Sequence, residues 1–219
     1  MDHWQGYIGL ILKGAVTTVE LTILGCALAL FMAFAAGLGR LSKRFTIRAL
    51  ATTYIEFFRG VSIFVQLFWA FFVLPLIGIP LSPFFCGVLV LGLNVGAYGA
   101  EVVRGAILAV PREQHEATVA LNFNAWQKMR YIILPQAFVL MLPTFGNNAI
   151  ELLKATAVVS LISISDMTFQ AQVVRSQTGD TAIPFLTILA LYFAMSLVIS
   201  TGVRGLERKL SQGLDVTKA

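Results

Sequence analysis

Residues 110–135 read VPREQHEATVALNFNAWQKMRYIILP, a compact polar segment between long apolar runs that carry almost no charge. A membrane chain seldom places a short amphipathic helix between two spans unless a soluble partner must grip it there. The segment therefore predicts a membrane protein on which force is exerted from outside the bilayer.

The composition of the chain predicts an all-α membrane protein. Of its 219 residues, 58% are hydrophobic and only 12% are charged, whereas soluble domains are about 25% charged. A helix needs about 20 apolar residues to cross the hydrocarbon core. Three uncharged stretches are each long enough for one crossing: residues 21–39, 131–150 and 181–203.

A fourth uncharged run, residues 60–100, is too long for one helix. Three prolines and one glycine divide it into two: Pro75, Gly78, Pro80 and Pro83. We therefore expect a single transmembrane domain (residues 1–219) with five helices, at about 14–39, 60–76, 84–108, 131–153 and 184–204. Residues 154–181 are expected to form short helices at the outer mouth of the helix bundle.

The distribution of basic residues predicts the orientation. Segments 40–59 and 101–130 and the tail after residue 203, which includes Lys218, hold 13 of the 16 Lys and Arg residues; the rest are Lys13, Lys154 and Arg175. Since cytoplasmic loops carry the excess of Lys and Arg, we expect the N-terminus outside and the C-terminus in the cytoplasm. The net charge of +5 is then a topology signal, and a nucleic-acid partner is not indicated.

The polar segment itself predicts a cytoplasmic helix over about 111–123. Pro111 suits a first helical turn, and Asn122 favours a turn at the other end. The helix would present a narrow apolar strip, formed by Ala117, Ala120 and Leu121. Such a strip can lie in a groove on another protein or rest on the lipid surface, although alanines offer little area to lipid.

The pattern E-x-x-R-G occurs twice, each time at the expected cytoplasmic end of a span. Residues at i and i+3 share a helix face, so Glu56 can pair with Arg59. Glu101 can pair with Arg104 in the same way. The pairs could neutralise charge at the membrane edge, brace the polar segment or form an inner gate.

Six polar residues fall at membrane depth and are candidates for a solute path: Gln66, Asn94, Tyr98, Asn147, Asn148 and Glu151. Polar side chains at that depth face either a cavity or a neighbouring helix, and both readings stay open for each residue. Glu151 and Asn148 are preferred, because a carboxylate can pair with a cationic group on a solute.

The polar segment resembles the EAA motif of bacterial ABC importer permeases through Glu116-Ala117, Leu121 and Ile133-Leu134-Pro135. The flanking sequence is similar to the polar amino acid uptake group. Ala155 and Ala157 depart from that group, which usually has Asp or Ser at the first position and Ser at the second. Residues 95–100 and 151–157 resemble permeases for ectoine and hydroxyectoine.

The resemblance implies a type I importer fold and a non-catalytic subunit of the bacterial cytoplasmic (inner) membrane. Its implied partners are an ABC ATPase dimer, a second permease subunit that is homologous or identical, and a periplasmic or lipid-anchored solute-binding protein. ATP and Mg²⁺ would bind to the ATPase and no cofactor to this chain. The implied ATPase contact is formed by Glu116, Ala117, Ala120, Leu121 and Asn122.

The main alternative is an ion-coupled secondary transporter of small polar solutes. Such carriers usually show an internal structural repeat, and the sequence has no repeat longer than the E-x-x-R-G pattern. A metal site is not predicted, because Cys26 and Cys86 lie inside apolar runs and His3 and His115 are far apart.

Overall fold

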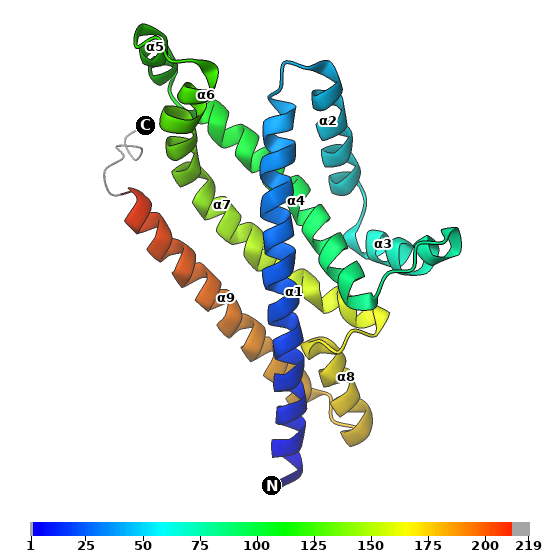
Figure 1. Ribbon diagram of the computed structural model, residues 1–219. Helices are drawn as coiled ribbons and strands as arrows, with labels where there is room; N and C mark the ends of the chain where they lie inside the picture. The colour runs from blue at the N-terminus through cyan, green and yellow to red at the C-terminus, as the bar shows by residue number, and fades with distance from the viewer. Residues whose placement is uncertain (1, 212–219) are drawn as a thin grey trace.

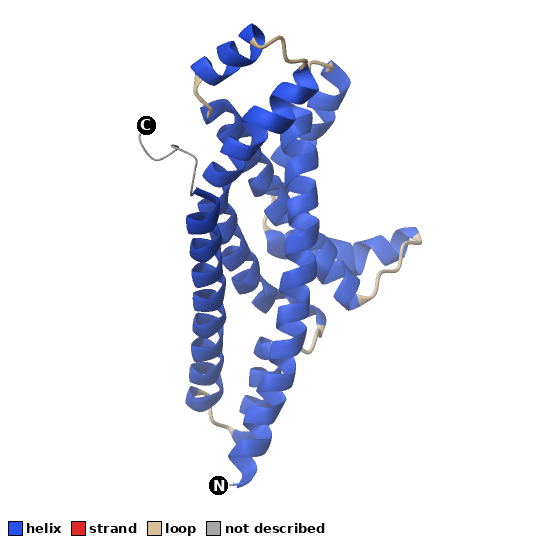
Figure 2. Ribbon diagram, turned by 60° about the vertical axis from the view of Figure 1, so that its left-hand side comes forward, coloured by secondary structure: helices blue, strands red, loops and turns tan. Residues whose placement is uncertain are grey.

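The computed structural model describes residues 2–211, and helix is the only regular structure within them (Figures 1 and 2). Lys218, which entered the orientation argument, lies outside the described residues. In chain order the elements are α1 (Asp2–Arg40), α2 (Phe45–Gly60), α3 (Ile63–Phe68), η1 (Trp69–Val73), η2 (Leu74–Ile77), α4 (Pro83–Ala109), α5 (Arg112–Ala120), α6 (Ala125–Gln127), η3 (Lys128–Ile133), α7 (Leu134–Ala155), η4 (Thr156–Ile162), α8 (Met167–Thr178) and α9 (Ala182–Ser211).

Helices α1 and α4 form the central pair, and small residues bring their backbones close together. A Cβ atom added at Gly92 would lie 2.7 Å from Cδ2 of Leu28, and one added at Gly37 would lie 2.7 Å from Cβ of Val103. Neither position can hold a larger side chain without moving its neighbour. The small residues therefore fix the distance between the two helices.

The second expected span differs from the structure. It was expected as one helix over 60–76, preceded by a cytoplasmic segment, but residues 45–60 form α2, which packs against α1 and α4 through Ala51 and Ile55. The chain then turns by 104° into the run Ile63–Ile77. Val61 and Ser62 have extended backbones at the turn, and the second run projects sideways from the body (Figure 1).

The other expected spans fall on long helices: α1, α4 and α9 contain three of them, and the span over 131–153 begins in η3 and continues through α7. Within the described residues, four helical stretches are long and apolar enough to cross a membrane, and a fifth is added if the bent pair formed by α2 and the run after it counts as one span. Many large apolar side chains on these stretches are exposed, including Phe31 at 69% and Phe193 at 65%. Exposed apolar side chains are expected on helix faces that contact lipid.

The connection between α7 and α9 packs against the N-terminal half of α1. Buried Asp166 begins α8 by accepting hydrogen bonds from the backbone N–H groups of Thr168 and Phe169. Burial raises the pKa of Asp166, and the backbone donors oppose that rise. The α1 backbone comes so close that a Cβ atom at Gly14 would lie 2.6 Å from the carbonyl oxygen of Asp166. The N-terminal half of α1 is thus fixed to α8.

Candidate functional site

Helix α5 lies at the same end of the molecule as the C-terminal end of α1 and at the opposite end from α8 (Figure 1). It begins after Pro111 and ends at Ala120, and the chain turns at Asn122, which has a φ of 56°. The observed helix lies within the range 111–123 that the sequence predicted for it. One buried residue anchors it: Thr118 is 1% exposed, and its backbone carbonyl accepts a hydrogen bond from the backbone N–H of Phe123.

The face of α5 turned away from that anchor is open to solvent. Ala117 and Ala120 are exposed, as are Leu121 at 65% and Val119 at 72%. Val119 did not belong to the predicted apolar strip, although it is the more exposed of the two large residues. The predicted strip was traced from Ala117 at helical spacing to Ala120 and Leu121, and Val119 does not fall on that spacing.

A hydrogen bond to α7 and an ion pair within α5 leave its apolar side chains uncovered. Glu116 forms an exposed ion pair with Arg112 at 3.4 Å, and such i,i+4 pairs contribute only about 0.3–0.5 kcal/mol. Nε2 of Gln136 on α7 donates to Oε1 of Gln114 at 3.3 Å. Burial, and secondarily the charge of Lys128, lower the pKa of His115. The helix is therefore positioned by its neighbours while its apolar side chains remain available.

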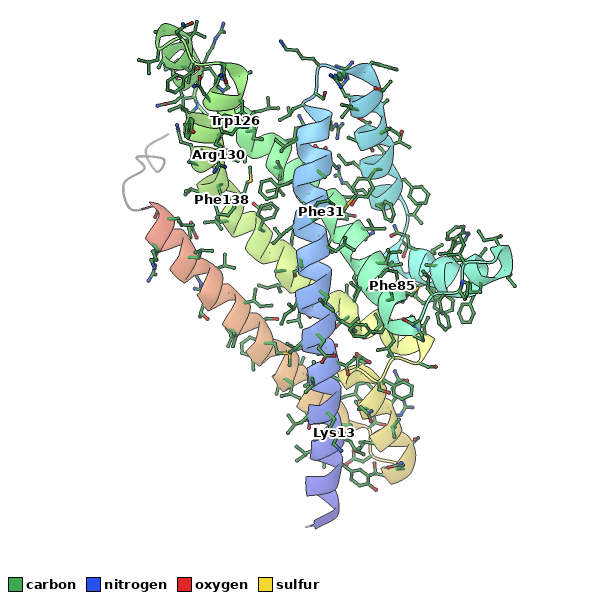
Figure 3. The ribbon with its side chains drawn as sticks, viewed as in Figure 1. Lys13, Phe31, Phe85, Trp126, Arg130 and Phe138 are labelled. Atoms are coloured by element: carbon green, nitrogen blue, oxygen red, sulfur yellow. The ribbon has the colours of Figure 1, made fainter. Side chains whose placement is uncertain are left out.

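The chain returns from α5 to α7 through a rigid turn. Asn124 and Gln127 form a reciprocal capping box at the start of α6, with hydrogen bonds of 2.9 and 3.0 Å. The guanidinium of Arg130 lies 5.8 Å from the ring centroid of Trp126, and Figure 3 shows the two side chains beside each other. Two hydrogen bonds and a cation–π contact therefore brace the connection between α5 and α7.

The two E-x-x-R-G patterns behave differently. Arg104 pairs with Glu101 at 2.9 Å, as the spacing predicts. Glu56 instead lies 3.8 Å from Arg40, which also pairs with Glu101. The guanidinium of Arg59 lies over the ring of Tyr98, 5.4 Å from its centroid. Arg40, at the end of α1, reaches both carboxylates, so one cation links α1, α2 and α4.

Gln66 and Asn94 are held by the bend between α2 and α3. Both donate to the carbonyl oxygen of Phe58, at 2.9 and 2.8 Å, and Gln66 also donates to that of Val61 at 2.8 Å. The turn leaves these carbonyls without helical partners, and buried carbonyls need partners. Both amides therefore have a structural role that the sequence could not reveal, since the bend was not predicted.

Of the remaining path candidates, Tyr98 lies on α4 one turn beyond Asn94, whereas Asn147, Asn148 and Glu151 lie on α7. Asn147 and Glu151 are exposed, and Lys154 neutralises Glu151 with an ion pair of 2.9 Å. Nδ2 of Asn148 is buried, and it is the only buried side-chain nitrogen or oxygen in the described part of the chain that lacks a hydrogen-bond partner. A polar group in that state is ready to bind an acceptor.

Asn148 lines a cavity of about 310 Å³ enclosed by α1, α4, α7 and α9. Its other lining residues are almost all apolar, with Phe34, Phe138 and Phe145 among them. A volume above about 300 Å³ can hold a small ligand. Asn148 is thus the one candidate that has an unpaired donor and also lines this cavity, although the donor nitrogen itself is buried.

Over residues 8–212 the sequence matches a family described as the binding-protein-dependent transport system inner membrane component. The chain belongs to this family. The permease is 43% identical to a probable amino-acid ABC transporter permease of Sinorhizobium fredii, over 95% of this chain and 90% of that protein. It is 33% identical to the glutamine transport system permease GlnP of Escherichia coli K12, over 93% and 94% of the two chains.

Solved structures agree with this assignment. The permease superposes on a chain of an amino acid ABC transporter crystallised with histidines, with a TM-score of 0.88 and 35% identity over 94% and 97% of the chains. An inward-facing MetNI methionine transporter chain shares the fold, with a TM-score of 0.78 at 18% identity over 92% and 96%. The permease is therefore a multi-pass, non-catalytic inner-membrane subunit of an ABC importer, in which a partner ATPase hydrolyses ATP.

Proposed function

We propose that the permease admits a small polar amino acid, driven by an ABC ATPase dimer that docks on α5. The observation that carries this proposal is the anchored helix itself, with Val119 and Leu121 exposed at 72% and 65% on a turn fixed by Thr118. The solute class is supported by relatives named for amino acids in general, for glutamine and, in Bacillus subtilis, for L-cystine.

Ectoine and hydroxyectoine remain a narrower choice within this proposal. They are small zwitterions, like amino acids, and the similarity of residues 95–100 and 151–157 to permeases for these solutes favours them. Family membership leaves the ion-coupled secondary transporter without support.

The proposed orientation has the N-terminus outside and α5 in the cytoplasm, where ATP is available. It rests on the excess of Lys and Arg at the α5 end of the molecule. We infer that Glu116, Ala117, Ala120, Leu121 and Asn122 form the ATPase contact. Closure of the ATPase pair would press on α5, and the turn at Asn124 would transmit the movement to α7.

The full assembly that we propose has three further components. A second permease, identical or homologous, completes the path, and a periplasmic or lipid-anchored binding protein delivers the solute. ATP and Mg²⁺ bind to the ATPase, and this chain needs no cofactor or metal of its own. Nucleic acid has no part in the assembly.

We assign Asn148 to the solute path, because its free Nδ2 can donate to a solute carboxylate or carbonyl inside the bundle. Glu151 ranks below Asn148 as a path residue, because Lys154 already balances the charge of Glu151. Asn147 is exposed on α7, which also carries Asn148, and Tyr98 is exposed on α4, which also lines the Asn148 cavity, so we include both in the proposed path. Gln66 and Asn94 are better explained by the bend.

The proposal is tested by replacing Ala117 in membrane vesicles that contain the complete transporter. Ala117→Asp places a charge in the apolar contact and should abolish ATP-driven uptake of labelled glutamine. It should also lower the amount of ATPase that copurifies with the permease. Ala117→Ser, which adds one oxygen and no charge, is the matched control and should keep both.

Normal uptake and normal ATPase retention in Ala117→Asp would rule out docking on α5. Uptake that follows an ion gradient without ATP would overturn the proposal altogether. Labelled ectoine, offered to the same vesicles, decides between the two solute choices.

A further inference from the structure

A second cleft opens between the ends of α1, α2 and α4 that lie near α5. It has a volume of about 560 Å³. Three arginines from three helices line it, Arg40, Arg48 and Arg104, together with the hydroxyls of Thr52 and Thr53. Its walls are therefore rich in hydrogen-bond donors of positive charge, unlike those of the apolar cavity at Asn148.

The acidic residues nearby do not balance this charge. Glu101 is shared between Arg40 and Arg104, and Glu56 also faces Arg40. Arg48 is exposed and makes no ion pair with any described residue. The cleft thus keeps an excess of positive charge that an anion can neutralise.

Two neighbouring cations add to that excess. Lys43 and Arg44 lie in the connection from α1 to α2, both are exposed, and neither makes an ion pair within the described residues. The first turn of α2 contains no acidic residue, and no side chain caps it. The partial positive charge at the N-terminus of α2 is therefore not balanced by an acidic residue in that turn, and it adds to the positive charge of the side chains.

The rim of the cleft is apolar. Phe45, which lines it, is 73% exposed. Leu41 contributes to the lining from the end of α1. An occupant that matches these features has an anionic head for the arginines and a hydrocarbon part for the rim.

We propose that this cleft binds a phosphate group, with Arg48 as its principal free ligand. The source that fits the apolar rim is the headgroup of an anionic phospholipid, whose chains would lie against Phe45 and Leu41. A soluble phosphate ester offers the same headgroup without chains. Basic clefts between transmembrane helices commonly hold anionic lipid headgroups. The site is separate from α5 and from the Asn148 cavity, and it serves neither docking nor the solute path directly.

The test uses the permease in the complex in which it is isolated, in a neutral detergent. Phosphatidylglycerol, phosphatidylcholine with the same chains, and glycerol 3-phosphate are titrated separately, and the midpoint of thermal unfolding is followed. Phosphatidylglycerol should raise the midpoint in a saturable manner, and phosphatidylcholine should not. In Arg48→Gln the half-saturating concentration should increase about fivefold, as expected for one cation lost beside an anionic headgroup.

Arg208→Gln is the matched control. It removes the same charge from an exposed position in the last turn of α9 and should titrate like the unaltered permease. A response to glycerol 3-phosphate that Arg48→Gln also weakens would identify a phosphate-ester site; a response to phosphatidylglycerol alone would identify a lipid site. Equal effects of the two lipids, or identical titrations of Arg48→Gln and Arg208→Gln, would overturn the proposal.

Discussion

At the scale of single residues, two asparagines on adjacent helices differ in whether their side-chain nitrogens are hydrogen-bonded. Asn94 gives its Nδ2 hydrogens to Phe58 and Gln66, at 2.8 and 3.3 Å, whereas Nδ2 of Asn148 has no partner. Burying an unpaired polar group costs about 1–3 kcal/mol. The first asparagine therefore stabilises the fold, and the second is kept at a cost that function can explain.

The same substitution at both sites separates these roles. Asn94→Leu should lower the thermal unfolding midpoint, because the Phe58 carbonyl loses a donor, at a cost of about 1–3 kcal/mol. Asn148→Leu should leave stability unchanged or improved but should impair solute uptake. Unfolding scans and vesicle uptake measure the two effects. Full uptake by a stable Asn148→Leu permease would remove this residue from the path.

At the scale of elements, the packing of α1 against α4 depends on which glycine positions leave room for a Cβ atom. At Gly37 an added Cβ would lie 2.7 Å from Cβ of Val103 and 2.8 Å from the carbonyl oxygen of Ala100. At Gly105, also within α4, it would have no atom within 4 Å. Two glycines in packed helices thus face very different surroundings.

We expect Gly37→Ala to destabilise the permease by roughly 1–3 kcal/mol, because the backbone oxygen cannot move aside cheaply. Gly105→Ala should be neutral or stabilising by up to about 1 kcal/mol, since alanine is the better helix former. Thermal unfolding of the two variants, side by side, checks the pair. Equal midpoints would show that the helices are not held at this separation.

At the scale of the whole molecule, the orientation can be measured from the two ends. Glu113 on α5 and Gln177 on α8 are both exposed and lie at opposite ends (Figure 1). The natural cysteines are a low background, since Cys86 is buried and Cys26 partly so. In intact cells, a membrane-impermeant maleimide should label Gln177→Cys. Glu113→Cys should react only after permeabilisation, and its reaction from outside would reverse the proposed orientation.

Much of this architecture could be predicted because its causes are local. The long apolar runs define α1, α4, α7 and α9, and Pro111 with Asn122 delimits α5. The bend at Val61 and Ser62 was missed, because it depends on Asn94, which is distant in sequence and supplies donors to the broken helix end.

The candidate site was predictable to a lesser degree. The i,i+3 rule predicted the Glu101–Arg104 pair, but it failed for Glu56, since Arg40 from another helix lies nearer than Arg59. Depth in the membrane made both Asn148 and Gln66 candidates for the solute path, with Asn148 preferred. Only the three-dimensional contacts show that one is bonded and the other free.

The position of Arg40 also bears on how the permease moves. One guanidinium ties α2 and α4 to α1 at the α5 end, and the glycine seam holds α1 to α4 along their length. We expect these three helices to behave as a stiff frame. Any rearrangement would then fall to α7 and α9, whose connections to α5 and α8 contain the left-handed residues Asn122 and Gly179.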